Sequence, residues 1–501
     1  MNRHQHGSQV STDRKVTPRI VLMILISALL ILLGTLYPFN FSFTDNFSLA
    51  ELFASFNNAS SFEDQVNNVL LFMPLGFCLS SCLQKLKITT ILQILIVVLI
   101  SASLSLTVEL LQVFLPSRIP TPADIMNNSL GGFFGWFCFY IWNYQSFTIT
   151  TTTIANSRYR HSQKQIIAFS LGYIFLTFLI AFFWQSTTNL GNWNFNYPLI
   201  IGNELTGDRP WKGYVSEIYI ANRAISPNEV TQGLANPDYF DNLGDSLLVN
   251  YQLQGKCCYQ EKSGKIPELL WQGQPSDSHD DKGVFVSSNQ WLQTANPVTS
   301  LSKSISKKSE FMLSITVATA NTEQIGPARI ISISGSSLRR NLTLSQQGNA
   351  LDFRLRTPLT GENGSDLKLL IPNIFVDTKP HQIIITYSRA TIQFYVDKLQ
   401  NYYSFNLLDL IPKNQKIVYY ALTFIPLGVS LALLTLASRS LIISRLLVVT
   451  GILLPSLILE FILVSENGKS LNLKNLLLGI LFTAGTMLIL KVRANQLKVR
   501  N

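Results

Sequence analysis

Six polar residues in the first part of the chain have side chains that could bind a ligand, and they lie within or beside strongly apolar runs. Glu109 and Gln112 are three positions apart, so they would share one face of a helix. An ionisable side chain within a membrane helix is costly unless it has a partner, and such residues are often functional. The candidate ligand-binding residues are Asn68, Glu109, Gln112, Arg118, Asp124 and Asn128.

These residues allow more than one interpretation. Glu109 could pair with Arg118, or it could receive an amine or hydroxyl group of a ligand. Asp124 could be a helix N-cap, because a carboxylate there accepts hydrogen bonds from free backbone amides. Paired carboxylates can perform acid–base chemistry, but no nucleophile, histidine or metal set accompanies this pair. We therefore assign no catalytic or metal-binding residue, and weigh binding against a structural tie between helices.

The elements that must position these residues are membrane-spanning helices. The 501 residues are 47% hydrophobic and only 14% charged, whereas soluble domains carry about 25% charged residues. A helix needs about 20 mainly apolar residues to cross the hydrocarbon layer. The apolar runs predict about eight such helices, at residues 20–37, 68–84, 88–115, 125–142, 166–184, 418–436, 441–464 and 473–490.

The distribution of charge predicts how the helices are oriented. The chain has 39 Lys+Arg and 29 Asp+Glu; residues 188–412 hold 19 and 20 of them, which leaves 20 and 9 for the helical parts. With both termini in the cytoplasm, 15 of those 20 basic residues lie on the inner side and 5 on the outer side, as the positive-inside rule requires. This predicts a multi-pass protein of the inner (plasma) membrane with residues 188–412 extracytoplasmic. The excess of lysine and arginine in the helical parts then reflects the orientation of the helices in the membrane and does not indicate a nucleic-acid partner.

The two helical parts contain an internal repeat. The sequence FMPLGF at 72–77 matches FIPLGV at 424–429, and NNSLGG at 127–132 matches NLLLGI at 475–480. Between them, Glu109 follows Pro74 by 35 positions and Glu460 follows Pro426 by 34. Four helices in each copy predict two parallel repeats with the same orientation. Because the second copy has no arginine at the place of Arg118, we expect the first copy to carry the polar chemistry and the second to be mainly scaffold.

The segments NVLLFMPLGF (68–77) and VELLQVFLPSRIPTPADIMNNSLGGFFG (108–135) resemble the VanZ-like membrane family. The resemblance covers about residues 20–145, and more weakly 165–187 with 415–490. It implies a bacterial cell-envelope protein, and the family is linked to resistance to the glycopeptide teicoplanin without an established molecular activity. The residues that carry the motif are Asn68, Pro74, Gly76, Glu109, Gln112, Arg118, Asp124, Asn128 and Gly131.

Residues 188–412 predict an all-β sandwich. Apolar and polar residues alternate over short runs at 310–318, 328–334, 350–356, 381–387 and 391–397, separated by turn residues. These runs resemble the laminin-G-like, concanavalin A-like jelly roll, but residues 198–226 resemble its last strands and come first here. The domain would therefore be circularly permuted, with both ends close to the membrane helices.

Such domains resemble binders of carbohydrate or protein. Trp211, Trp271 and Trp291 could stack on sugar rings if exposed, although a buried core position is the commoner fate of a tryptophan in a sandwich. Calcium is the one cofactor the loops suggest, because carboxylate oxygens ligate it, but no loop has convincing calcium spacing. The acidic residues concerned are Asp208, Asp280 and Asp281.

Together these patterns predict an α-helical polytopic membrane protein with an inserted all-β domain. Its expected partners are the lipid bilayer and an envelope glycan, peptidoglycan precursor or surface protein. We favour a binding or accessory role; the alternatives are an enzyme or transporter acting on a lipid-linked substrate at the Glu109, Arg118 and Asp124 cluster, and a structural anchor for an adhesive domain. The expected segments are a cytoplasmic tail (1–19), a VanZ-like unit (20–145), a cytoplasmic linker (146–165), a fifth helix (166–187), the sandwich (188–412), three helices that complete the second unit (413–490) and a second tail (491–501).

Overall fold

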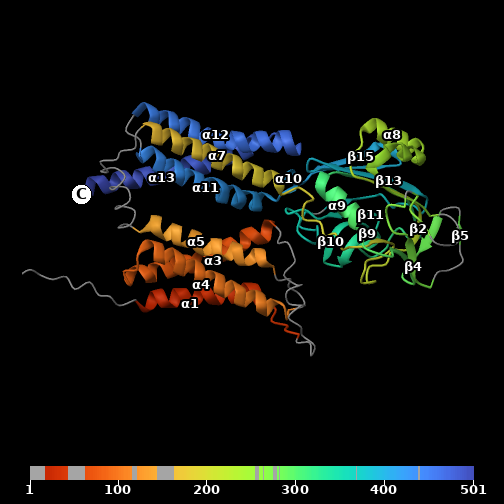
Figure 1. The fold of residues 1–501 in the computed structure, drawn as a ribbon, viewed down its shortest axis with the longest axis horizontal. Helices are drawn as coiled ribbons and strands as arrows, with labels where there is room; N and C mark the ends of the chain where they lie inside the picture. Colours follow the sequence, from red (N-terminus) through yellow and green to blue (C-terminus); the bar gives the residue numbers. More distant parts are fainter. Residues whose placement is uncertain are drawn as a thin grey trace, which may run out of the picture. The chain divides into compact units, whose positions relative to one another are not determined.

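The computed structural model divides the chain into two compact units, Met1–Thr153 and Ile154–Asn501, and each is described by itself (Figure 1). The first unit is helical; the second combines helices with a β-sandwich. The described residues are 17–42, 62–115, 121–143, 163–253, 259–262, 264–274, 279–280, 283–367, 369–437 and 441–500.

Four helices form the described part of the first unit, and each overlaps a predicted span. Two of them begin at a proline in the first helical turn, where the missing N–H costs nothing and the fixed φ suits the helix. The helices are α1 (Pro18–Leu36), α3 (Phe62–Lys85), α4 (Thr90–Gln112) and α5 (Pro122–Trp142).

Helices α3 and α5 pack unusually closely because glycines face the neighbouring backbone. A Cβ on Gly76 would lie 2.1 Å from the carbonyl oxygen of Gly132, and a Cβ on Gly135 would lie 2.1 Å from that of Met73. Neither site can hold a larger residue without movement of a helix. Small residues at such contacts are typical of helix pairs in membranes.

The second unit contributes four more long helices. They are α7 (Gln163–Ser186), α11 (Lys413–Ala437), α12 (Leu441–Asn467) and α13 (Leu473–Arg500). Buried polar groups link them: the hydroxyl of Tyr173 on α7 donates to the carbonyl of Gly451 on α12 at 2.8 Å, and the indole of Trp184 donates to Thr423 on α11 at 3.1 Å.

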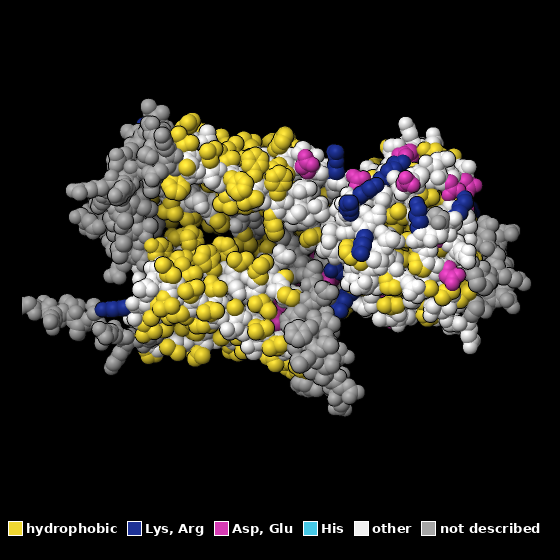
Figure 2. Space-filling model, in the orientation of Figure 1, with side chains coloured by type: hydrophobic (Ala, Val, Ile, Leu, Met, Phe, Trp, Pro, Cys, Tyr) yellow, Lys and Arg dark blue, Asp and Glu magenta, His cyan; other side chains and the backbone are white. Residues whose placement is uncertain are grey.

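Seven helices in the described part of the chain are long and apolar enough to cross a membrane, which supports a multi-pass membrane protein. Helix α5 is the predicted span that is not among them, because Asn127 and Asn128 lower its hydropathy. Hydrophobic side chains cover much of the visible helical surface, whereas lysine, arginine, aspartate and glutamate are scattered over the sandwich (Figure 2).

Two antiparallel sheets form the β domain between α7 and α11. One has the strand order β12-β11-β10-β9-β1-β7-β4, and the other has the order β15-β14-β13-β8-β2-β6-β5 with β3 paired to β2. The strands are β1 (Leu199–Ile201), β2 (Gly213–Ala221), β3 (Leu247–Gln252), β4 (Leu269–Gly273), β5 (His279–Asp280), β6 (Gly283–Val286), β7 (Gln290–Thr294), β8 (Phe311–Thr319), β9 (Ala328–Ser336), β10 (Arg339–Gln347), β11 (Ala350–Leu355), β12 (Leu369–Ile371), β13 (His381–Ser388), β14 (Thr391–Val396) and β15 (Lys398–Asn406).

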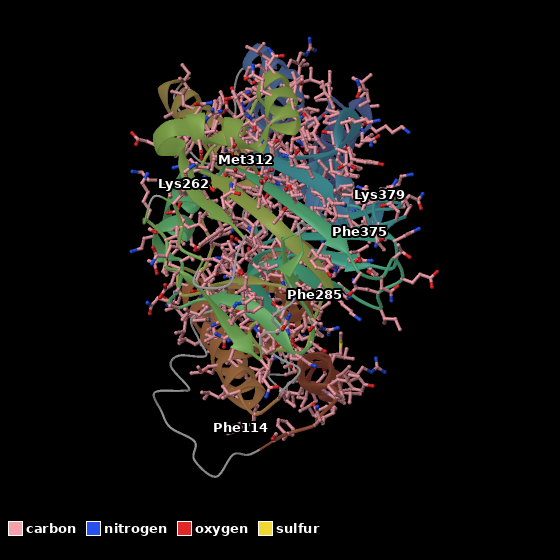
Figure 3. The ribbon with its side chains drawn as sticks, turned by 90° about the vertical axis from the view of Figure 1, so that its right-hand side faces the viewer. Phe114, Lys262, Phe285, Met312, Phe375 and Lys379 are labelled. Atoms are coloured by element: carbon pink, nitrogen blue, oxygen red, sulfur yellow. The ribbon has the colours of Figure 1, made fainter. Side chains whose placement is uncertain are left out.

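The core of the sandwich lies between the two sheets. The rings of Phe353 on β11 and Phe394 on β14 meet edge to face, with centroids 5.4 Å apart. The first two strands, β1 and β2, each lie inside a sheet and not at its edge. Figure 3 views the domain end on, with Met312 and Phe285 carried by strands and Lys262 and Lys379 at opposite sides.

Asn467, at the end of α12, joins the sandwich to the helices of the second unit. Its amide donates to the carbonyl of Gln185 at 3.1 Å and to the hydroxyl of Thr188 at 2.8 Å. Its own carbonyl accepts from Asn406 at 2.8 Å, and Ser470 in the following turn bonds Asp409 at 2.8 Å. Polar contacts therefore hold together the two places where the chain enters and leaves the sandwich.

Candidate functional site

A stripe of polar residues runs along the buried face of α4. Gln93, Ser101, Ser105 and Glu109 are buried and are separated by multiples of four positions, and Gln112 continues the stripe. Residues four apart lie above one another on a helix. This spacing is visible in the sequence, so the serines could have been included among the candidate residues.

Glu109 closes the connection between α4 and α5. Its side chain is 2% exposed, and its Oε2 accepts the backbone N–H of Thr121 at 2.8 Å. Thr121 is the N-cap position of α5, where backbone amides lack partners within the helix. Asp124, in the first turn of α5 and half-buried, is close enough to interact electrostatically with Glu109. The structure therefore brings these two predicted carboxylates together.

The two predicted amide residues face different helices. Asn128 is buried and its amide donates to Ser105 at 2.8 Å, which places it one helical turn from Glu109 along α4. Gln112 instead donates to the carbonyl of Thr35 on α1 at 2.9 Å. Asn128 thus belongs to the α4–α5 contact, whereas Gln112 ties α4 to α1.

Of the two remaining candidate residues, the structure describes Asn68 and does not describe Arg118. Asn68 is half-buried on α3, and a Cβ on Gly131 would lie 2.4 Å from the carbonyl oxygen of Val69, so this turn of α3 lies against α5. Gly131 is one turn beyond Asn128 on α5. Arg118 lies outside the described residues.

Several buried polar atoms at the α4–α5 contact, and one on the side of α5 that faces α3, have no hydrogen-bond partner among the described residues. They are the hydroxyls of Ser101 and Thr121, Nδ2 of Asn127 and Oδ1 of Asn128. A buried polar group without a partner costs free energy, and within a membrane it is expected to serve a purpose. Asn127 was not among the residues predicted from the sequence.

Comparison with family models adds to this geometry. The model described as VanZ/LLP1 matches residues 20–143. That match spans α1, α3, α4 and α5, and it supports a VanZ-like membrane protein of the cell envelope. No curated protein and no solved structure matches the chain.

The second unit has its own buried polar centre. Glu460 accepts the hydroxyl of Tyr420 at 2.7 Å, and Lys469 contacts its two oxygens at 2.8 and 2.7 Å. The side chains of Lys469 and Glu460 are 2% and 3% exposed. Buried polar residues therefore also hold together the helices of the second unit, which agrees with a mainly structural role for this part of the chain.

The spacing of the sequence relates these residues to candidate residues of the first unit. Lys469 follows Glu460 by nine positions, as Arg118 follows Glu109, and Tyr420 precedes Pro426 by six, as Asn68 precedes Pro74. The sequence analysis expected an arginine at this place, whereas Lys469 supplies the positive charge. In the second copy, a cation and a hydroxyl supplied by the chain satisfy the glutamate completely.

The structure describes some of the candidate residues on the sandwich. Trp211 is fully buried and its indole donates to Gln346 at 2.8 Å, so it is not available to a sugar. Asp208 pairs with Arg209 on the surface at 3.7 Å; the side chain of Asp280 and the whole of Asp281 lie outside the described residues. The described residues contain no group of three or more His, Cys, Asp or Glu side chains that could hold a metal ion.

Proposed function

We propose that this chain is a binding protein of the cell envelope that receives the polar headgroup of a lipid-linked molecule between α4 and α5. The observation that carries the proposal is the set of buried, unpartnered polar atoms on Ser101, Thr121, Asn127 and Asn128, which extends over the turns of α4 and α5 from the Glu109–Thr121 contact. Their amide and hydroxyl groups match the hydroxyls and amines of a sugar or peptide headgroup.

The surroundings of these atoms support a ligand with a lipid tail. Leu106 and Leu110 on α4 and Met126 on α5, which lie close in sequence to Glu109 and Asn127, are 44%, 38% and 62% exposed, as expected of side chains that face hydrocarbon. A headgroup could enter the polar stripe while its acyl or prenyl chain stays against these side chains. In the cell, such binding would give this chain its role in tolerance of glycopeptide antibiotics, which act on envelope precursors.

The test separates binding from structure by choosing substitutions that keep the fold. Glu109→Gln removes the charge but still accepts the N–H of Thr121. Asn127→Leu removes an amide whose Nδ2 has no partner among the described residues, so the fold loses no hydrogen bond there. We expect each to weaken binding of a polyprenyl-diphosphate disaccharide in nanodiscs at least tenfold, with unchanged protein abundance and melting temperature.

Ser129→Ala is the matched control, because Ser129 lies on the same helix and bonds only the carbonyl of Ile125 within it at 2.7 Å. It should bind the probe as the wild type does. Wild-type affinity in both test variants would contradict the proposal. Loss of abundance in both would show that the polar stripe holds the helices together and does no more.

A further inference from the structure

The outer face of the seven-stranded sheet is polar but buried. Along β9, β10 and β11, Ile331, Leu344 and Phe353 point into the core, and the alternate positions Ser332 and Ser345 point away from it. The outer face of an antiparallel sheet is normally open to water. Here it is covered, because both serines are fully buried.

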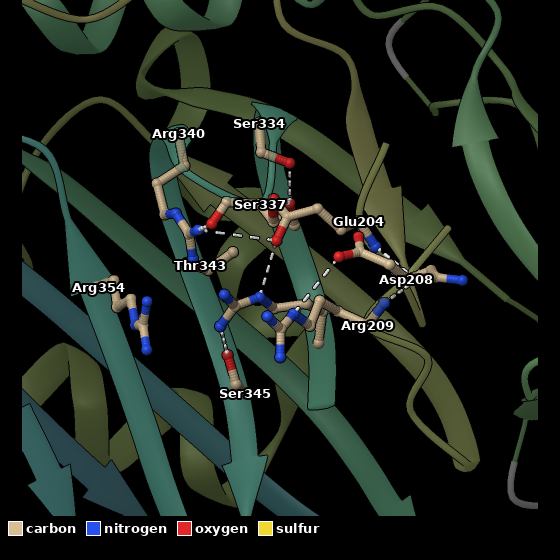
Figure 4. Close-up of polar contacts among 12 residues, drawn as sticks. Glu204, Asp208, Arg209, Ser334, Ser337, Arg340, Thr343, Ser345 and Arg354 are labelled. Atoms are coloured by element: carbon tan, nitrogen blue, oxygen red, sulfur yellow. Dashed lines mark hydrogen bonds and ion pairs between the residues drawn. The ribbon is translucent and has the colours of Figure 1, made fainter. Parts of the chain in front are cut away.

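Two loops cover this face. The loop after β1 brings in Glu204, which is fully buried and accepts Nε of Arg329 at 2.9 Å (Figure 4). The segment after β11 brings in Glu362, whose carbonyl accepts the backbone N–H of Arg340 at 3.1 Å and whose carboxylate accepts Arg356 at 2.9 Å. The covered face therefore collects charged side chains from both sources.

The cluster beneath the loops has an excess of positive charge. Arg329 lies 3.7 Å from Asp352, Arg340 lies 3.9 Å from Glu204, and Arg354 lies 3.2 Å from Asp352. Three guanidinium groups thus share two carboxylates, which leaves a net charge of +1. Burial of a charge without a counter-charge is strongly unfavourable. Burial and the neighbouring Arg329 accordingly lower the pKa of Arg340 to about 9.

Buried donors on this face also lack acceptors. Nε of Arg340, and Nε and Nη1 of Arg356, have no hydrogen-bond partner among the described residues, although the two residues are 0% and 3% exposed. Guanidinium groups are suited to carboxylate and phosphate, which accept from two N–H groups at once. These donors do not line the pocket beside Arg354, so an anion in that pocket would balance the charge of the cluster without bonding to them.

Arg354 gives this cluster a route to solvent. Its side chain is 21% exposed, and it lines a pocket of about 190 Å³ with Gln347, Asp352 and Ser365. Sites for drug-sized ligands measure roughly 300–1,000 Å³, so this pocket suits a smaller ligand of about one sugar ring.

We propose that this pocket binds an oxyanion, a carboxylate or phosphate group carried on a sugar-sized ligand, with Arg354 as the contacting residue. Arg329 and Arg340 add positive potential to the cluster, and Asp352, which Arg329 also approaches, holds Arg354 in position together with Asn363. The site lies in the sandwich, so it is independent of the headgroup site between α4 and α5.

The experiment measures binding of glucuronate, glucose and inorganic phosphate to the full chain in detergent by isothermal titration calorimetry. We expect saturable binding of glucuronate at least tenfold tighter than that of glucose, weakened at least tenfold by Arg354→Gln. Arg209→Gln is the matched control, because Arg209 is an exposed arginine of the same domain that does not line the pocket; it should bind as the wild type does.

A second variant separates loss of the binding site from a folding defect. Ser365→Phe fills the pocket without removing charge and should abolish binding while the melting temperature stays within a few degrees. Binding of phosphate but not glucuronate, with the same dependence on Arg354, would support the proposal and identify phosphate as the group recognised. Binding of neither anion, or equal affinity in the wild type and Arg354→Gln, would overturn it.

Discussion

A carboxylate buried between membrane helices needs hydrogen-bond donors, and Glu109 and Glu460 obtain them differently. Glu460 is saturated by Tyr420 and Lys469, both from its own unit. Glu109 accepts one backbone N–H from Thr121, beside polar atoms of Asn127 and Asn128 that have no partner among the described residues. The VanZ-like copy therefore has unused hydrogen-bonding capacity, and the second copy does not.

The hydrogen bonds of Glu460 predict that replacing this single residue strongly lowers the stability of the chain. Glu460→Gln leaves the ammonium of Lys469 buried without its counter-charge, and breaking a buried pair in this way costs about 3–5 kcal/mol. We expect a clear fall in the melting temperature of the detergent-solubilised chain. The double variant Glu460→Gln/Lys469→Met should recover most of the loss, because the glutamine still accepts Tyr420 and the methionine needs no partner.

Glu466→Gln is the control for this prediction, because Glu466 is exposed on the same helix; its melting temperature should stay within about a degree of the wild type, since isolated surface charges contribute little. A Glu460→Gln chain as stable as the wild type would show that Lys469 finds another partner.

The sequence predicted which polar residues are buried between the helices better than it predicted their hydrogen-bond partners. Glu109, Asp124 and Asn128 do come together, because the short connection between α4 and α5 places the end of one helix beside the start of the next. The bond from Gln112 to Thr35 depends on how α1 packs, and the spacing of residues on α4 contains no information about that. Pairing across helices is set by tertiary packing, which a single sequence does not encode locally.

At the scale of elements, the glycines of α3 and α5 determine how closely two helices approach. Gly76→Ala would place a Cβ 2.1 Å from the carbonyl oxygen of Gly132. Overpacking of this kind costs about 1–3 kcal/mol, so we expect lower abundance and a lower melting temperature.

The matched control is Gly172→Ala on α7, where a Cβ would have no neighbour within 4 Å. Alanine is favoured over glycine in a helix by about 1 kcal/mol, so this chain should be as stable as the wild type or slightly more so. Equal stability of the two variants would mean that α3 and α5 can separate without cost.

Helices and strands were the most predictable elements. Apolar runs of membrane length located the eight long helices of the described residues, and period-two alternation located β8, β9, β11, β13 and β14. Helix ends differed by several residues, as at Phe62, six positions before the predicted start of α3, because polar turns extend a helix beyond the hydrocarbon without an apolar signal. The burial of the outer sheet face was not predictable, since the covering loops have no periodicity.

At the scale of the whole molecule, the remaining question is which side of the membrane the sandwich occupies. The positive-inside rule predicts that it is extracytoplasmic. In a chain whose five cysteines are replaced, Lys379→Cys should react with a membrane-impermeant maleimide in cells with a permeabilised outer barrier and an intact inner membrane. Lys379 suits this test because its side chain is 82% exposed.

Lys85→Cys, at the end of α3, should react only after the inner membrane is broken. The reverse pattern, with Lys85→Cys labelled first, would place the sandwich in the cytoplasm and invert the proposed topology.

The attachment of the sandwich through Asn467 has a mechanical consequence. A domain on one flexible tether turns freely and passes no load to its anchor. Here α7 enters, α11 leaves, and the end of α12 is bonded to both junctions through Gln185, Thr188 and Asn406. A force applied to the sandwich is therefore shared among three helices at once. The domain should keep a fixed orientation on these helices.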